Sequence, residues 1–449
     1  MVFLSGICFA QVPESEDVEV DDVEPDIYAT LVFARPELVI EGLDPMPADN
    51  QTLSREVEIE AIQTSNVNRL ESIRQYQATI NELEFEGGAW EQGLTQELLA
   101  MGSLQQQLGS HPAAVEAYTR AMQVSRINYG LDNLEQVSIV EQLINSHLAL
   151  GQWEKADQYH NYLYYTQKKA YGHDDPRMIP VLDRLASWSL SAFNGGYGEA
   201  VGLRLFTAFY SYRAASNIVS MHFGEDDERF VKYLKEMAAT AYLVYRNPRL
   251  IEVAGQPKYR SVRLMFENEN NQYDTINPPG YKDGREALER IVNHYADKED
   301  KQSEFAQALI SLADWHLMFD RRRTASGYYQ QAINILSGLD QGEELIQDFL
   351  GNVEPLPELS QKIRQLPDST TSGELPAEIN YTGVVDVIFD VTIYGGVANL
   401  EVLTEETEAN SKVLSLLRRK VRNTVFRPSV VEGELVRTSD NHFRYRYWY

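Results

Sequence analysis

A 42-residue internal repeat limits the folds open to this chain more than any other feature of its sequence. Gly109 recurs as Gly151, and Ala114 recurs as Ala156, each at a separation of 42 residues. In both copies we expect one helix to end near the glycine and a second helix to begin by the alanine. Each such hairpin leaves an apolar face uncovered, so neighbouring hairpins must stack. The repeat therefore predicts a solenoid of helical hairpins within residues 54–350.

Further copies of the unit follow along the chain. A third copy lies between about 179 and 227, and it contains the insertion FNGGYGEA. A later copy fits 308–336, and a partial copy precedes it at 283–295. The small positions of the later copies are held by Ala287, Ala313, Ala325 and Ala332. Because several positions recur in register, the pattern favours a repeat array over an unrelated all-helical domain.

These units resemble the tetratricopeptide repeat family in its 42-residue form, known from kinesin light chains. The matching residues are Gly102, Ala114, Tyr118 and Ala121 in the first copy, and Ala156 and Leu163 in the second. The second copy departs from the pattern, with Ile144 where a small residue is expected and His160 at an aromatic position. The resemblance implies a protein-binding solenoid whose first helices line a concave groove.

The residues expected in that groove are polar. They are Gln96, Ser103, Gln106, Ser138, Glu141, Asn145, Asp183 and Ser187. This set is slightly acidic and lacks the lysine and arginine side chains with which some tetratricopeptide domains bind a terminal carboxylate. We therefore expect an extended neutral or basic peptide as the ligand. The alternative is that these are ordinary solvated helix positions.

Two proline-bearing segments interrupt the predicted helices. The first, near 247–282, contains four prolines and is either a loop packed along the solenoid or a linker between two helical blocks. The second, 351–374, is rich in Pro, Ser and Thr and marks a domain boundary. The fold class is thus mainly α, with a separate small domain at 375–449.

The hydrophobic period changes in this carboxy-terminal domain. Residues 383–393 alternate between apolar and other side chains, and a Tyr-Gly-Gly hairpin turn leads to a return strand at 397–403. An amphipathic helix is predicted at 411–426, stopped by Pro428, and a last strand lies within 435–447. The expected order is strand, strand, helix, strand, which makes a small α+β domain.

This domain resembles the carboxy-terminal domain of the TonB energy-transducer family. The resemblance rests on the hairpin at 383–403, on VFRP at 425–428 and on EGELV at 432–436. It implies a periplasmic module whose last strand is an open edge that pairs with a peptide of an outer-membrane receptor. Arg444 and Arg446 on that strand are therefore candidate partner-binding residues. Members of that family have a membrane helix and a long Pro-rich spacer before this domain, whereas this chain has only a short apolar start and a solenoid in the spacer's place.

The amino-terminal region has three parts. Met1–Ala10 (MVFLSGICFA) is similar to the apolar end of an export signal cleaved before Gln11, although the usual preceding basic residues are missing. Residues 11–53 are expected to be an acidic and largely disordered lead-in, since 14–26 carry eight acids and no base. Within this lead-in, the β-like pattern of 27–40 predicts an extended segment that docks. The protein is therefore expected to be periplasmic or exported.

Overall charge argues against nucleic acid as a partner, and hydropathy argues against a membrane-spanning helix. The 40 Lys and Arg stand against 67 Asp and Glu, a net charge of −27, which argues against nucleic-acid binding. After residue 11, no window approaches the roughly 18 apolar residues that a membrane-spanning helix needs, so no span is expected in the mature chain. The remaining partner class is a protein or peptide, with an envelope or outer-membrane protein as one candidate.

No catalytic, cofactor or metal site is predicted. The single cysteine, Cys8, excludes an internal disulfide, and the eight histidines form no two-histidine helical metal motif. The run at 173–175 (HDD) is interpreted as a helix cap, and the glycines at 194–198 lack the lysine of a phosphate loop. The sequence thus predicts a non-enzymatic envelope scaffold. An accessory of TonB-type transport and an uncharacterised enzyme remain the alternatives.

Overall fold

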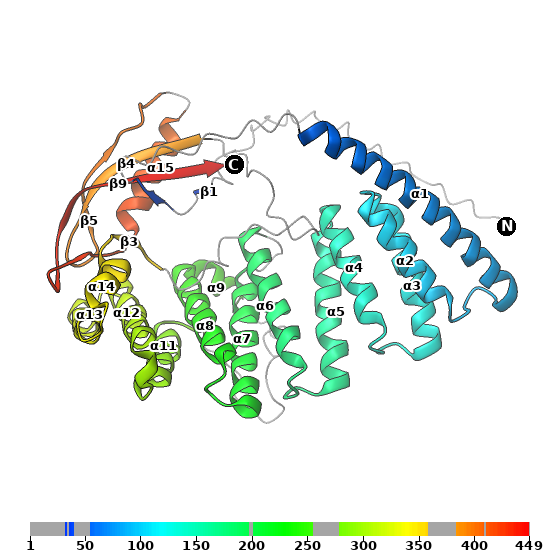
Figure 1. Ribbon diagram of the computed structural model, residues 1–449, viewed down its shortest axis with the longest axis horizontal. Coiled ribbons are helices and arrows are strands. Elements are labelled where there is room, and N and C mark those ends of the chain that lie inside the picture. The colour runs from blue at the N-terminus through cyan, green and yellow to red at the C-terminus, as the bar shows by residue number, and fades with distance from the viewer. Residues whose placement is uncertain are drawn as a thin grey trace, which may run out of the picture.

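The arrangement of helices confirms the predicted solenoid. The computed structural model describes residues 32–33, 36–39, 54–196, 201–254, 278–357, 383–407 and 410–448. The predicted export signal, the acidic run at 14–26 and the larger parts of both proline-bearing segments lie outside these residues. Helices follow one another in an arc from α1 to α14, and a small sheet with its own helix lies over one end of that arc (Figure 1).

Successive helices pair as hairpins after the long helix α1 (Ser54–Gly87). The hairpins are α2 (Leu94–Gln107) with α3 (His111–Tyr129), α4 (Gln136–Ala149) with α5 (Trp153–Tyr171), α6 (Met178–Asn194) with α7 (Gly202–Phe223), α8 (Glu228–Arg246) with α11 (Tyr281–Ala296), and α12 (Gln302–Met318) with α13 (Arg322–Ser337). A short 3-10 turn, η4 (Glu299–Lys301), leads into α12. The first two hairpins follow the 42-residue spacing.

The repeated glycines have a conformational role. Gly109 and Gly151 have φ values of 73° and 68°, in the left-handed region that glycine occupies without steric penalty. Each lies directly after the first helix of its hairpin, where the amide of the following residue returns to the helix, as Ser110 N–H donates to the Gln105 carbonyl at 2.9 Å. The glycine therefore ends the first helix and reverses the chain toward the second.

Small residues let the helices of a hairpin approach closely. A Cβ added to Gly102 would lie 2.6 Å from the Tyr118 ring, and Ala114 is fully buried between the same helices. Near α5 and α6 the buried core changes from one cluster, around α1–α5, to a second, around α6–α12; a third cluster surrounds α12–α14. Trp188 and Ala192 of α6 belong to the first cluster, so they join the two parts of the solenoid.

The first proline-bearing segment interrupts a single hairpin. Helices α8 and α11 pack against each other although 247–280 separate them in sequence. The described start of this segment forms α9 (Pro248–Ala254), which packs on α7 so closely that a Cβ on Gly202 would lie 2.3 Å from the Leu250 carbonyl oxygen. The expectation of a linker between two helical blocks is therefore wrong, because the helices on either side form one unit.

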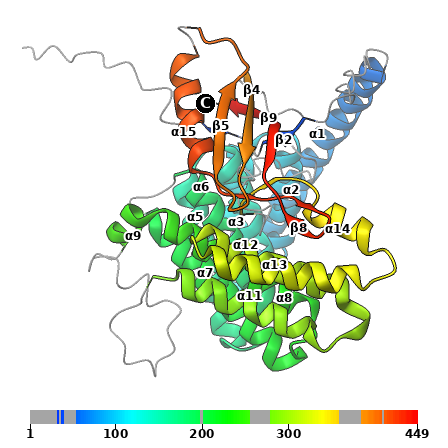
Figure 2. The ribbon, with the colours of Figure 1, turned by 90° about the vertical axis from the view of Figure 1, so that its left-hand side faces the viewer.

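The carboxy-terminal domain has the predicted order of elements. Strand β4 (Gly383–Val391), strand β5 (Val397–Val402), helix α15 (Ser411–Asn423) and strand β9 (Thr438–Trp448) follow one another. The antiparallel sheet has the order β5-β4-β9, and α15 lies beside it (Figure 2). The interface is a compact apolar cluster that includes Val387, Phe389, Leu414, Leu417 and Phe443.

Helix α15 ends three residues earlier than the sequence predicts. Thr424 is already extended, with ψ of 133°, and Phe426–Arg427 form the short strand β6, which pairs with β3 (Glu354–Pro355). Pro428 accounts for part of the difference, because a residue before proline disfavours the helical conformation. Burial of Phe426 against Phe389 and Phe443 accounts for the rest.

Strand β9 is not the open edge that the sequence predicts. Strands β1 (Val32–Phe33) and β2 (Glu37–Leu38) of the chain's own amino-terminal region pair with it on the side away from β4. The register shifts by one residue between the two short ladders, where Pro36 lies and has no amide hydrogen to donate. An extended segment thus docks as the pattern of 27–40 predicts, and it covers the expected peptide-binding edge.

A buried ion pair joins the carboxy-terminal domain to the hairpin of α12 and α13. Arg427 Nε of β6 donates to Asp314 Oδ1 of α12 at 3.0 Å, and Tyr329 of α13 donates its hydroxyl proton to the same oxygen at 2.6 Å. The Arg427 and Asp314 side chains are 6% and 3% exposed. Helix α14 (Gly342–Leu350) and the hairpin of β7 (Val430–Val431) with β8 (Glu434–Leu435) pack around this contact. The two domains therefore share one buried polar network.

Candidate functional site

Three of the eight predicted groove residues line one hollow. Glu141 and Asn145 come from α4, and Ser187 comes from α6. The hollow has a volume of about 430 Å³, and its other walls include His160 of α5 together with Arg184 and Trp188 of α6. We call it the groove pocket. It lies among α4, α5 and α6.

The other predicted groove residues have different roles. Gln106 Nε2 donates to Ser146 Oγ at 3.1 Å and so joins two neighbouring hairpins. Ser103 Oγ accepts a bond from Gln107 at 3.4 Å within its own helix. Gln96 and Ser138 are exposed and are not in the lining of the groove pocket.

The groove is closer to neutral than the sequence predicts. Arg184 on α6 forms an ion pair with Glu141 on α4, and Lys232 on α8 donates to Asp183 on α6 at 2.9 Å. In each pair, the basic residue belongs to the helical hairpin that follows the hairpin of the acidic residue along the chain. Both bases are bound to acids, so neither is a free cation for a terminal carboxylate.

His160 and Trp188 form an aromatic stack in the groove pocket. Their ring centroids are 4.5 Å apart, and the planes differ by 12°. Burial lowers the pKa of His160 to about 3; Asp157 opposes this shift, whereas Arg184 and Arg204 add to it. The Trp188 indole N–H donates to Asp157 Oδ1 at 2.8 Å, and Arg204 pairs with the same carboxylate. The imidazole is therefore neutral at physiological pH.

We predict that the wild-type chain loses stability more steeply than a His160→Phe variant as the pH falls from about 6.5 to about 3. The unfolded chain binds a proton at its ordinary pKa of 6.5, whereas the native imidazole stays neutral down to about 3. Above pH 6.5 neither state binds this proton, so His160 adds no pH dependence to the stability. Below pH 6.5 the unfolded chain binds the proton and the native chain does not, so the free energy of unfolding decreases progressively as the pH falls. Urea unfolding at several pH values measures it. Parallel pH profiles of the two chains would contradict the prediction.

Part of this site carries a sequence signal. The repeat pattern singles out His160, because it stands at a position where the family has an aromatic residue. Arg184 and Trp188 have no comparable signal, since arginine and tryptophan are unremarkable at helix positions. Only the stacking of α4, α5 and α6 brings the three side chains to one hollow.

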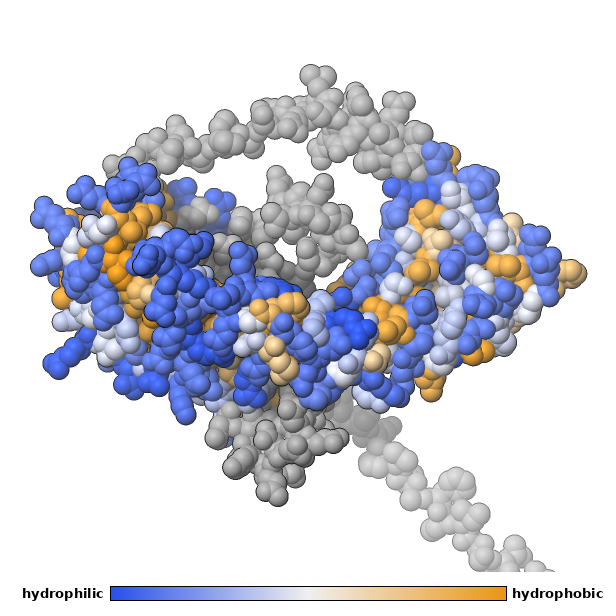
Figure 3. Space-filling model, turned by 60° about the horizontal axis from the view of Figure 1, so that its bottom comes forward, coloured by the Kyte–Doolittle hydropathy of each residue, from blue (hydrophilic) through white to orange (hydrophobic). Residues whose placement is uncertain are grey.

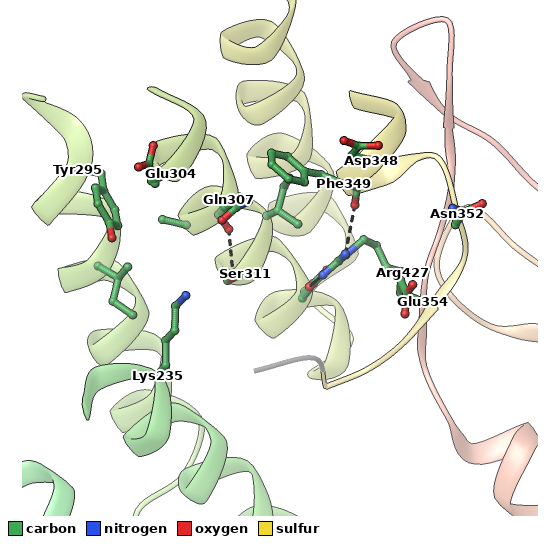
Figure 4. A pocket seen from close by; sticks show the side chains of 14 residues that line it. Lys235, Tyr295, Glu304, Gln307, Ser311, Asp348, Phe349, Asn352, Glu354 and Arg427 are labelled. Carbon is green, nitrogen blue, oxygen red and sulfur yellow. Dashed lines mark hydrogen bonds and ion pairs between the residues drawn. The ribbon is translucent and has the colours of Figure 1, made fainter. Parts of the chain in front are cut away.

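A second hollow lies where the solenoid meets the carboxy-terminal domain (Figure 4). This junction pocket has a volume of about 360 Å³ and is lined by charges of both signs, among them Lys235 of α8 and Glu304 of α12. A hydrogen bond from Lys301 lowers the pKa of Glu304. Arg427 and Asp314 lie in its wall, bound to each other. The pocket is therefore partly occupied by the contact that holds the two domains together.

The two arginines predicted on β9 lie beside β4. Arg444 donates to both carboxylate oxygens of Asp386, at 2.8 and 2.9 Å, and this lowers the pKa of Asp386. Arg446 lies opposite Val384 in the register of β4 and β9. Arg444 thus ties two strands of the sheet together, and the strand edge beyond it is covered by β1 and β2.

The described residues contain no group of three or more His, Cys, Asp and Glu side chains placed to hold a metal ion. Asp175 of the HDD run accepts a hydrogen bond from the Arg177 amide at 2.8 Å, next to the start of α6.

Among the helices that the structure describes, none is both long and apolar enough to cross a membrane. The surface in Figure 3 is mostly hydrophilic, with hydrophobic residues in separate patches.

Comparison with known proteins yields structural similarity alone. No family model matches the chain, and no curated protein matches it. A putative kinesin light chain from P. anserina with nearly identical TPR-like repeats aligns at 14% identity and a TM-score of 0.33, covering 56% of this chain and 94% of its own. BtubC from P. vanneervenii aligns at 12% identity and a TM-score of 0.34, covering 64% of this chain and 91% of its own.

Proposed function

We propose that this chain is a non-enzymatic scaffold that holds an extended peptide segment of a partner protein on the face formed by α2, α4 and α6. The observation that supports it most is the groove pocket, a concave site on packed helices that combines apolar and hydrogen-bonding walls. Such a site is largely preformed, so little ordering entropy opposes binding. A side chain of the peptide that fills the pocket would act as the anchor.

Selection from a displayed library of random peptides tests this function with the full chain. Enriched peptides should bind the wild type and lose at least about tenfold in affinity when Asn145→Trp fills the pocket. Ala170→Trp is the control, because it adds the same side chain to an exposed site on α5, outside the face formed by α2, α4 and α6. Failure to enrich any peptide, or equal binding to both variants, would refute the proposal.

The proposal includes a location outside the cytoplasm. It is supported by the apolar start Met1–Ala10, which is similar to the end of an export signal. Mass spectrometry of the protein from its native cells should find Gln11 as the first residue. An intact Met1 on the mature protein would contradict export and leave the peptide-binding proposal standing.

The proposal also assigns the carboxy-terminal domain to the TonB-like class. The order β4-β5-α15-β9 supports this assignment. Since β1 and β2 cover β9, we assign peptide binding to the solenoid and not to this domain.

A further inference from the structure

His160 has unused hydrogen-bonding capacity in the wall of the groove pocket. It is 9% exposed, and neither ring nitrogen makes a hydrogen bond to the described part of the protein. Its ring nitrogens are not among the fully buried atoms that lack a partner, so water or a ligand in the pocket can reach them. A neutral imidazole carries one donor and one acceptor. The stack on Trp188 covers a ring face and leaves the ring edge for a ligand.

The charged groups around the pocket are already paired. Glu141 is bound by Arg184, and Asp157 by Arg204. A charged ligand would lose its hydration without gaining a free counter-charge, which is unfavourable. Asn145, also in the wall, makes no hydrogen bond to the described residues and offers a carboxamide. The pocket therefore favours an uncharged group that both donates and accepts hydrogen bonds.

We propose that the groove pocket binds the carboxamide side chain of an asparagine or glutamine, which pairs with His160 and Asn145. A planar amide matches both partners, because it has an acceptor oxygen and two donor hydrogens. An aliphatic side chain would leave the imidazole without a partner, and a carboxylate or ammonium group would remain uncompensated. This inference rests on the proposed function only for the statement that the amide belongs to a peptide.

Small-molecule probes test the pocket independently of any peptide. The full chain, labelled with carbon-13 at histidine, is titrated with propionamide, propionate, propylamine and p-cresol, and the His160 signal is identified by its absence in His160→Phe. Propionamide should shift this signal saturably, with an affinity about tenfold above that of the other probes. The exposed His222 should not respond. No saturable shift, or an equal or stronger response to a charged or phenolic probe, would overturn the proposal.

Peptides enriched by the library provide the second test. Replacing the anchoring Gln or Asn by Leu should weaken binding to the wild type at least about tenfold, and binding to His160→Phe less than about twofold. Phe keeps the stack on Trp188 and removes both nitrogens. Asn145→Leu supplies the same comparison if His160→Phe does not fold. If the chain binds propionamide but no peptide, the proposed function fails and the inference about the pocket stands.

Discussion

An Asp314→Ala chain is expected to lose about 3–5 kcal/mol of unfolding free energy, because Arg427 would remain buried without a counter-charge. The same carboxylate accepts the hydroxyl proton of Tyr329, so a second buried group would lose its partner. Arg427 also donates to the Phe349 carbonyl at 3.2 Å, so the loss would reach the connection through α14. Equilibrium urea unfolding measures the difference, and loosening of the carboxy-terminal domain should accompany it.

An exposed ion pair of the same domain is the control. Glu406 pairs with Arg418 on the surface, so Glu406→Ala should change stability little. A double variant, Asp314→Leu with Arg427→Met, should be more stable than either single variant, since no charge is left unpaired. If Asp314→Ala costs no more than Glu406→Ala, the buried pair does not hold the domains together.

A Gly284→Ala variant is expected to be destabilised by about 1–3 kcal/mol through overpacking. A Cβ on Gly284 would lie 2.2 Å from the Trp315 ring, which is fully buried and donates its N–H to the Tyr281 carbonyl at 3.1 Å. The ring also packs on Phe319, so it cannot move aside freely. This cost exceeds the gain of about 0.5–1 kcal/mol that alanine brings to a helix interior.

Gly327→Ala is the matched control for that variant. Gly327 also lies within a helix, but an added Cβ there would have no atom within 4 Å apart from its chain neighbours and the backbone of its own helix. The same substitution should therefore stabilise the chain by about 0.4–1 kcal/mol. Thermal unfolding of the two variants should show shifts of opposite sign. Stabilisation by Gly284→Ala would mean that the contact between α11 and α12 is looser than described.

Much of the solenoid could be predicted from the sequence, because its signals are local. The turn after the first helix of a hairpin needs a residue with a left-handed backbone conformation, and the glycines at 109 and 151 indicate this conformation in the sequence. Alternation at 383–391 likewise identifies a strand with one buried face. The end of α15 was predicted less well, because the tertiary burial of Phe426 overrides the helical pattern at its end.

The sequence by itself therefore determined the hairpins, their spacing and the strand-strand-helix-strand order, since each depends on residues a few positions apart. Only the tertiary structure decided that α8 pairs with α11 across an insertion, that β1 and β2 cover β9, and that Arg427 meets Asp314, 113 residues away. It also placed His160, Arg184 and Trp188 around one hollow. Contacts of this kind join segments that are distant along the chain, and no local periodicity encodes which segments will meet.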